Sequence, residues 1–357
     1  MKLVTDWFRR TFADPQVVVL ILVLVAGFAV VLTMGDMLAP ALASVVIAYL
    51  LEGIVGFLER RHVPRMAAVL MVFVAFLLFV VVVLFGLMPL LSRQLTELVQ
   101  QLPLMAAQGQ KLLMQLPERY PELVSAAQVQ EVIATLKSEL ARIGQALLSL
   151  SLSSVVGIIT LMVYLILVPL LVFFFLKDKQ LILGWMLQFL PEERRITDEV
   201  WRDVDAQIAN YVRGKFWEII IVGSVSYAVF SAFGLNYALL LAVLVGLSVV
   251  VPYVGAAVVT FPVMLIAWFQ WGWGTEFIWL TVAYLVIQAL DGNVLVPLLF
   301  SEVVSLHPVA IIIAILVFGG IWGFWGVFFA IPLATLVKAV LSAWPRTDTI
   351  APTESTS

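Results

Sequence analysis

The sequence contains no cysteine, which excludes disulfide bonds, thiolate metal sites and cysteine nucleophiles. It has only two histidines, His62 and His307, too few for a metal centre built from histidine. The chain also lacks a phosphate-binding loop, a catalytic triad and any nucleophile–base pair at helical spacing. We therefore expect no enzymatic activity, no metal site and no cofactor.

Charge is scarce as well. Asp, Glu, Lys and Arg make up 12% of the 357 residues, whereas hydrophobic residues make up 63%, and the mean hydropathy is +1.10. Soluble domains carry about 25% charged residues. The 20 basic and 23 acidic residues give a formal net charge of −3, so the chain has no basic field for nucleic acid. These numbers predict an integral membrane protein whose partner is the lipid bilayer.

Apolar runs long enough to cross a bilayer recur along the chain. A bilayer core about 30 Å thick needs roughly 20 apolar residues in a helix. Five runs come close to or exceed this length, Ile219–Phe233 is shorter, and two longer blocks are less regular. In order the segments are Val17–Met34, Leu38–Phe57, Met66–Leu90, Ser153–Leu176, Ile219–Phe233, Leu235–Gln270, Phe277–Phe300 and Val309–Leu341. We predict an all-α polytopic membrane protein with about eight membrane segments.

The basic residues predict how the chain is oriented. With the amino terminus inside, 15 of the 20 Lys and Arg residues lie on the cytoplasmic side, as the positive-inside rule requires. Both termini are then cytoplasmic. The resulting segments are an N-terminal three-helix region (1–90), a periplasmic helical segment (91–150), a fourth membrane helix (151–176), a cytoplasmic amphipathic helix (177–213), a C-terminal core (214–342) and a disordered tail (343–357).

Two polar segments have helical periodicity. Apolar residues alternate by three and four at Val129, Ile133, Leu136, Leu140, Ile143 and Leu147, and again at Leu91, Leu95, Leu98 and Leu102. We predict helices joined around Pro103, Pro117 and Pro121 that pack either on each other or on another subunit of a homo-oligomer. Residues 192–213 predict an amphipathic helix at the cytoplasmic surface, or alternatively a gate or coupling helix.

The two irregular apolar blocks are interrupted. One breaks at Pro252, Tyr253 and Gly255, and the other at a run with Gly319, Gly320, Gly323 and Gly326. Backbone at such breaks cannot face lipid, so these blocks predict re-entrant hairpins or broken helices. In the predicted topology, an outward span precedes the first block and an inward span precedes the second, which is an inverted repeat. Plain helices with glycines at close contacts are the alternative.

Asp291 is the leading candidate for a functional residue. A carboxylate at membrane depth is costly and usually faces a cavity, a partner or an ion path. Gly292 permits local unwinding, Asn293 offers a carbonyl oxygen, and Gln288 lies one turn earlier. The alternatives are ordinary solvation near the cytoplasmic interface, or pairing with Arg213 or Lys215, which are also candidates for cytoplasmic coupling. Glu218 is expected to pair locally with Lys215.

Several of these stretches resemble the autoinducer-2 exporter family of bacterial inner-membrane proteins. The matching motifs, in order, are PLLVFFFLKDK (169–179), YVRGK (211–215), PYVG (252–255), QALDGNVLVP (288–297), His307-Pro308 and FGGIWGFWGVFFAIP (318–332). The resemblance implies transport in the inner membrane, either export of autoinducer-2 or exchange of sodium or lithium for protons.

Three functions follow as hypotheses. The first is a secondary transporter that exports a small polar solute under a proton or sodium gradient, with Asp291 and Asn293 binding the coupling ion and the two breaks forming gates. The predicted substrate- or ion-binding residues also include Gln288, Gly292, Pro252, Tyr253 and Gly255, and the glycine run is predicted to serve gating or structure. The second is a cation/proton antiporter with the same residues. The third is a membrane scaffold that holds partners through residues 91–150 and 192–213.

Overall fold

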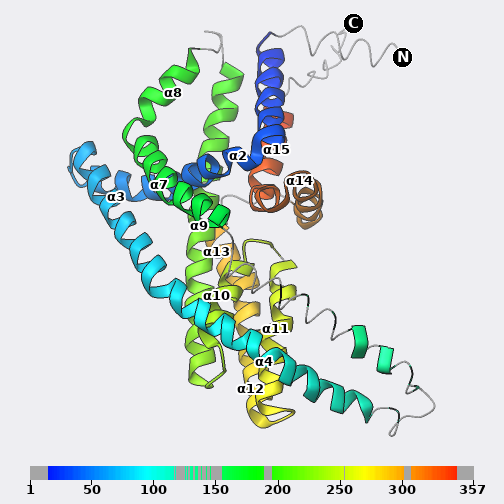
Figure 1. Ribbon diagram of the computed structural model, residues 1–357. Helices are drawn as coiled ribbons and strands as arrows, with labels where there is room; N and C mark the ends of the chain where they lie inside the picture. Colours follow the sequence, from blue (N-terminus) through cyan, green and yellow to red (C-terminus); the bar gives the residue numbers. More distant parts are fainter. Residues whose placement is uncertain are drawn as a thin grey trace, which may run out of the picture. The chain divides into compact units, whose positions relative to one another are not determined.

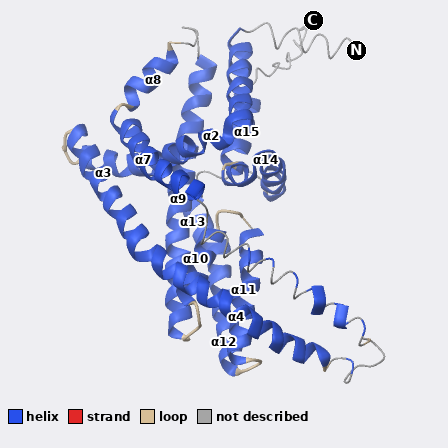
Figure 2. Ribbon diagram, viewed as in Figure 1, coloured by secondary structure: helices blue, strands red, loops and turns tan. Residues whose placement is uncertain are grey.

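The computed structural model describes residues 15–115, 155–188, 195–252, 254–300 and 307–343, together with scattered positions between 117 and 145. All regular structure in this described part is helical (Figure 2). Six of its helices are long and apolar enough to cross a membrane, and a bent pair of helices would add a seventh. The predicted all-α polytopic fold is confirmed. Most of residues 116–150 of the predicted segment 91–150, and residues 344–357 of the predicted tail, lie outside the described residues.

The helices are shown in Figure 1. In chain order they are α2 (Pro15–Arg60), α3 (Arg65–Val82), the π-helix η1 (Val83–Leu87), α4 (Met88–Met114), α7 (Val155–Lys177), α8 (Lys179–Leu187), α9 (Arg195–Ala232), α10 (Ala238–Ser248), α11 (Val254–Trp271), α12 (Thr275–Leu290), the π-helix η2 (Asp291–Leu295), α13 (Val296–Phe300), α14 (Pro308–Phe328) and α15 (Ala330–Ala343).

These helices form two compact units, and each unit is assembled from segments far apart in the sequence. The first unit combines residues 1–56, 171–214 and 300–357, and the second combines 57–170 and 215–299. Long helices contribute to both: residues up to 214 of α9 belong to the first unit, and Lys215 and the rest of the helix belong to the second. The C-terminal core expected at 214–342 is therefore divided between the two units.

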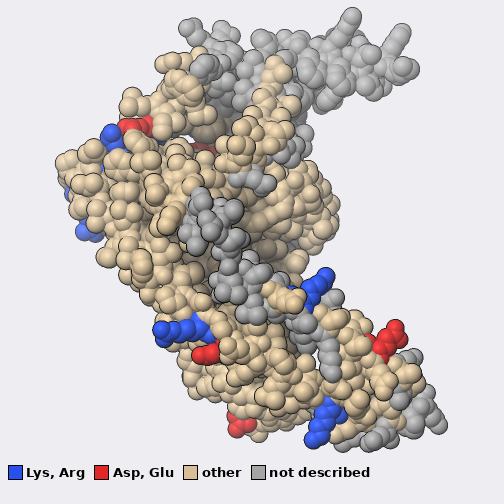
Figure 3. Space-filling view, in the orientation of Figure 1, with Lys and Arg blue, Asp and Glu red and all other residues tan. Residues whose placement is uncertain are grey.

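Much of the helix surface is apolar, as a bilayer environment requires. Leucine, valine, isoleucine and phenylalanine side chains are exposed on nearly every helix, and Figure 3 shows a face on which charged side chains are few and isolated. In water such a surface would drive aggregation, whereas lipid tails solvate it at no cost.

In the first unit, α2 replaces two of the predicted spans. The runs Val17–Met34 and Leu38–Phe57 form one helix of 46 residues, which bends about halfway along in Figure 1. Pro40 lies inside it and lacks the amide hydrogen that a helix interior needs. The hydroxyl of Ser44 donates to the carbonyl of Pro40 at 2.6 Å. A proline inside a helix bends it without ending it. The helix also continues through residues 35–37, the gap between the two predicted runs.

Helix α9 similarly merges two predicted elements. The expected surface helix 192–213 and the expected span Ile219–Phe233 are parts of one helix of 38 residues. Among the predicted apolar positions, Val204 and Val212 are buried. The segment 177–194 also contains a separate short helix, α8, which bends from α7 by 77° at Asp178.

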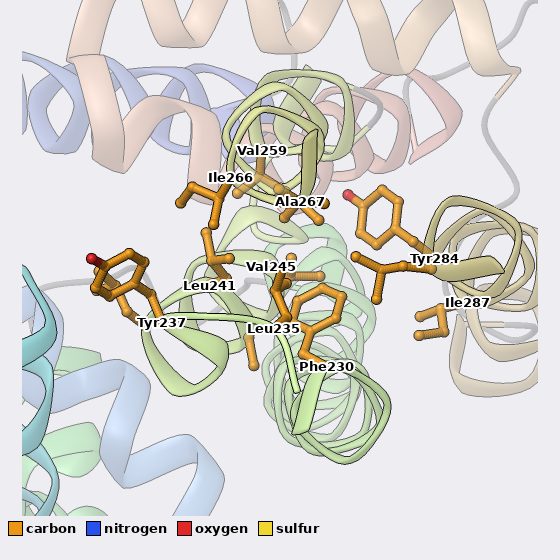
Figure 4. Packing of buried hydrophobic residues seen from close by; sticks show 14 of the residues in the cluster. Phe230, Leu235, Tyr237, Leu241, Val245, Val259, Ile266, Ala267, Tyr284 and Ile287 are labelled. Atoms are coloured by element: carbon orange, nitrogen blue, oxygen red, sulfur yellow. The ribbon is translucent and has the colours of Figure 1, made fainter. Parts of the chain in front are cut away.

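The second unit has a hydrophobic core built from the end of α9 and from α10, α11 and α12. Figure 4 shows this cluster, in which Phe230, Leu241, Val245, Val263 and Tyr284 are among the fully buried side chains. The ring of Phe230 lies 6.2 Å from that of Tyr284, between their centroids, which joins α9 to α12. This core fixes the helices that carry the candidate site.

Helix α4 packs onto the same core, and this corrects part of the prediction for residues 91–150. Leu91, Leu95 and Leu98 pack against the core cluster. Pro103 lies inside α4 and does not mark a joint between helices. At the start of α10, the amide of Leu240 donates to Oε1 of Gln94 at 2.9 Å. Gln94 thus satisfies one of the amide groups that a helix start leaves unpaired.

We expect Gln94→Ala to lower the thermal unfolding midpoint of the purified protein. The substitution leaves the amide of Leu240 without its acceptor, at a cost of about 1–3 kcal/mol for a buried group. The matched control is Gln100→Ala on the exposed face of the same helix, which should change the midpoint little. Equal effects of the two substitutions would contradict the packing of α4 against α10.

Candidate functional site

The second unit contains a buried ion pair near the start of its part of α9. Lys215 is 5% exposed and Glu218 is 2% exposed, and Nζ of Lys215 lies 2.7 Å from Oε2 of Glu218. The two residues are three apart on one helix, so the expected local pair is confirmed. Breaking a buried pair by removing one partner typically costs about 3–5 kcal/mol, because the remaining charge stays buried alone.

Lys215 also joins α9 to the end of α10. Its Nζ donates to the carbonyl oxygen of Val249 at 2.7 Å, and Val249 is the C-cap residue of α10. The last carbonyls of a helix have no partner within the helix, and they carry the negative end of its dipole. The buried ammonium group of Lys215 supplies both a hydrogen-bond donor and a positive charge to this helix end, at the point where the first apolar block is interrupted.

Asp291 brings a second carboxylate to this cluster. It is half-buried and begins the π-helix η2, and it interacts electrostatically with both Lys215 and Glu218. Its Oδ1 atom is buried and has no hydrogen-bond partner. We call Lys215, Glu218 and Asp291 the charge cluster. One ammonium group faces two carboxylates, so the cluster has a formal charge of −1 when all three are ionised.

The neighbours of Asp291 divide into two groups. Gln288, one turn earlier, has a buried Nε2 atom without a hydrogen-bond partner. Asn293 is exposed, and its Nδ2 donates to the carbonyl of Ala289 at 2.8 Å. Gly292 is exposed too, and a β-carbon there would meet no atom within 4 Å. The expected unwinding occurs as a π-helix, a distortion that is frequent at functional sites.

The first interruption, between α10 and α11, lies where the sequence predicts it. Helix α10 ends at Ser248, Pro252 follows, and α11 begins at Val254; Tyr253 lies outside the described residues. Gly255 is buried, and a β-carbon at this position would overlap the carbonyl group of Ser248. Glycine here allows the start of α11 to turn back against the end of α10.

At the second interruption, in the first unit, a glycine again allows close packing on the backbone. Gly323 has φ 57° and ψ −132°, which breaks α14 inside the predicted glycine run. A β-carbon on Gly326 would overlap the carbonyl group of Phe318, and one on Gly319 would lie 2.8 Å from Cγ2 of Val327. At Gly320 a β-carbon would meet nothing within 4 Å. In both blocks, a glycine thus packs against a backbone carbonyl seven or eight residues upstream.

The role of Tyr211 was not predicted from the sequence, in which this residue is marked only as the first of the YVRGK motif. Tyr211 is fully buried, and its hydroxyl donates to the carbonyl of Phe328 at 2.9 Å. Phe328 is the last residue of α14, just after the break at Gly323. The Tyr211 ring also contacts the rings of Phe300 and Phe328, at centroid distances of 5.9 and 6.0 Å. The motif therefore supplies a donor to the end of each interrupted helix.

Arg213 in the same motif does not join the charge cluster. Its Nε donates to the carbonyl of Ala209 at 2.9 Å and its Nη2 to Oδ1 of Asn210 at 3.3 Å. The guanidinium lies against α2 at Gly53, where a β-carbon would come within 3.3 Å of Nη1. Of the two candidates for cytoplasmic coupling, Arg213 belongs to the first unit and Lys215 to the buried cluster of the second.

Comparisons with known proteins agree with these motifs. A family model described as AI-2E family transporter matches residues 19–346. The chain belongs to the AI-2E transporter family. It is 46% identical over 345 residues to the "Putative permease PerM" of Escherichia coli strain K12, covering 97% of this chain and 98% of that protein. It is 27% identical to the "Putative transport protein YrrI" of Bacillus subtilis strain 168, with 87% of each chain covered.

A more distant relative also spans most of the chain. A "Putative transport protein" of Thermotoga maritima is 24% identical, covering 93% of this chain and 95% of that protein. The family assignment, together with six or seven helices that can cross a membrane, identifies the chain as a multi-pass membrane transport protein. The lipid bilayer is its environment.

The interrupted helices give a direct test of their glycines. We expect Gly255→Ala and Gly326→Ala each to lower the thermal unfolding midpoint, because the added methyl group overlaps backbone and such overpacking typically costs about 1–3 kcal/mol. Gly320→Ala is the matched control, since its methyl group meets open space within a helix. If the unfolding midpoint of Gly255→Ala or Gly326→Ala is as high as that of Gly320→Ala, the close approach of that glycine to the upstream carbonyl is contradicted.

Proposed function

We propose that the chain is a secondary transporter that exports a small polar solute such as autoinducer-2 and is driven by an ion gradient, with Asp291 carrying the coupling ion. One observation carries the proposal. Lys215 and Glu218 are buried, Asp291 is half-buried with a buried Oδ1 atom that has no hydrogen-bond partner, and the cluster contains one carboxylate more than its ammonium group can neutralise. A carboxylate in such a position has a strong affinity for one further positive charge.

The location of the cluster supports coupling between ion binding and conformation. Lys215 holds the end of α10 at its break, and Asp291 begins a π-helix in the helix opposite. Binding a cation or a proton at Asp291 changes the electrostatic balance around Lys215. Because the same ammonium group holds the carbonyl of Val249, this change acts on the interrupted helix directly. Alternating access would then arise from movement of one repeat against the other.

The two interrupted helices support the inverted repeat. Each follows a long apolar span, each has a glycine packed on an upstream carbonyl, and each ends in a carbonyl that receives a side-chain donor. In this proposal the gates contain Pro252, Tyr253 and Gly255 in one repeat and the glycine run in the other. Both termini lie in the cytoplasm and the chain resides in the inner membrane of a bacterium.

Exchange of sodium or lithium for protons is the second candidate. The surplus carboxylate of the charge cluster favours it equally, because Asp291 could bind a proton and a metal cation in turn. The family assignment favours either kind of transport over a scaffold. In addition, Leu91, Leu95 and Leu98, which a scaffold would offer to partners, contact the core of the chain itself.

The test is efflux of autoinducer-2 from preloaded proteoliposomes under an imposed proton gradient. We expect Asp291→Asn to abolish the gradient-dependent part of the efflux, since an amide cannot release or accept the coupling proton. Glu276→Gln is the matched control: it removes an exposed carboxylate in the first turn of α12, and its efflux should equal that of the wild type.

Both variants are first compared with the wild type for thermal unfolding midpoint and for incorporation into liposomes. Full gradient-dependent efflux by Asp291→Asn would refute the coupling role of Asp291. If wild-type vesicles show no efflux but release protons when sodium or lithium is added, antiport replaces export. The same Asp291→Asn vesicles should then release none.

A further inference from the structure

The surroundings of the Lys215 ammonium group resemble those of a bound alkali cation. Its ammonium group donates to two oxygen atoms at 2.7 Å, the carboxylate of Glu218 and the carbonyl of Val249. Asp291 adds a second carboxylate within electrostatic range. Carboxylates, backbone carbonyls and the C-terminal ends of interrupted helices are the groups that bind sodium in transporters with broken helices. In this chain a side chain fills that position.

Lys215 also makes the cluster unfavourable for a second metal cation. Its charge is nearly excluded from solvent, so screening by water and salt is weak and it repels any cation that approaches Glu218 or Asp291. Oδ1 of Asp291 still has no hydrogen-bond partner. A proton can bind to this single oxygen, whereas a metal cation requires several oxygen ligands around it.

We propose that Lys215 acts as a tethered substitute for a bound sodium ion, so that the coupling ion of this transporter is the proton and the binding position for sodium is already occupied. The inference rests on the proposed function for its consequence in transport, but not for its consequence in ion binding. Lys215 is then the residue that determines ion specificity, and Asp291 is the residue that takes up the proton. Removing the ammonium group while keeping both carboxylates should expose a sodium site.

The first test measures ion binding and requires no knowledge of the solute. Thermal unfolding midpoints of the purified protein are compared in sodium chloride and in choline chloride at equal ionic strength and pH. A ligand that binds only the folded state raises the midpoint. We expect the wild type to have the same midpoint in both salts. Lys215→Gln should have a lower midpoint in choline than the wild type, and sodium should raise it.

Two further variants assign the sodium effect to the cluster. The double variant Lys215→Gln with Asp291→Asn should lose the response to sodium, because one of the two carboxylates is gone. Lys215→Gln with Glu276→Gln should keep it, since Glu276 is exposed and lies at the other end of α12. A sodium response in all variants alike would reflect a general salt effect and would overturn the assignment.

The wild type alone keeps the proposal testable if Lys215→Gln does not fold in either salt. A rise of the wild-type midpoint in sodium that is absent from Asp291→Asn would show that the cluster binds sodium with Lys215 in place, and would refute the proposal. An equal wild-type midpoint in the two salts would support it. These measurements are independent of autoinducer-2 efflux, so a failure of the proposed cargo and a failure of this inference are distinguishable.

In proteoliposomes the inference predicts a change of driving ion. Flux through the wild type should follow the proton gradient and be unaffected by replacing sodium with choline. Flux through Lys215→Gln should depend on sodium. Sodium-driven flux through the wild type would contradict the inference. It would also be contradicted if Lys215→Gln folds but neither its flux nor its unfolding midpoint responds to sodium.

Discussion

A carbonyl group at the end of an interrupted helix needs a hydrogen-bond donor wherever water is excluded, and the second half of this chain depends on that constraint. Among the described residues, the carbonyls of Val249 and Phe328 are examples, each at the end of one of the interrupted apolar helices. Each receives a side-chain donor from α9: the ammonium of Lys215 and the hydroxyl of Tyr211. The donors stand four residues apart in YVRGK. A short stretch of one helix thus stabilises both breaks.

One of these two donors, Lys215, is charged, and a buried charge places a further requirement on the structure. A buried ammonium group needs a counter-ion, and Glu218 provides it one turn along the same helix. The pair is neutral when both groups are ionised. Asp291 adds a carboxylate that this structural need does not explain, and its Oδ1 atom has no hydrogen-bond partner. A group that is costly and structurally unnecessary is best understood as functional. We therefore propose that the cluster combines the structural pair Lys215–Glu218 with a functional third member, Asp291.

The sequence predicts the parts of this arrangement that depend on local signals. Pro252, Gly255 and the glycine run mark the two interruptions, the spacing of Lys215 and Glu218 marks their pair, and the scarcity of charge draws attention to Asp291. Contacts between distant residues are not predictable in this way. Lys215 and Val249 are 34 residues apart, and Tyr211 and Phe328 are 117 apart. Two predicted helix boundaries are wrong, because α2 continues through residues 35–37 and α4 continues through Pro103.

Gly255 and Gly326 allow the two arms of each interrupted helix to pack closely together without a long connecting loop. At Gly255 and at Gly326, the absence of a side chain lets the chain pack directly on an upstream carbonyl. The helix that enters each break and the helix that leaves it are therefore held in close contact, and their end carbonyls lie at fixed positions. Fixed carbonyls can be bound by single side chains of α9. In the proposed mechanism, a change in the charge of the cluster would act on the hydrogen bond between Lys215 and Val249, whereas the close contact at Gly255 involves no charged group.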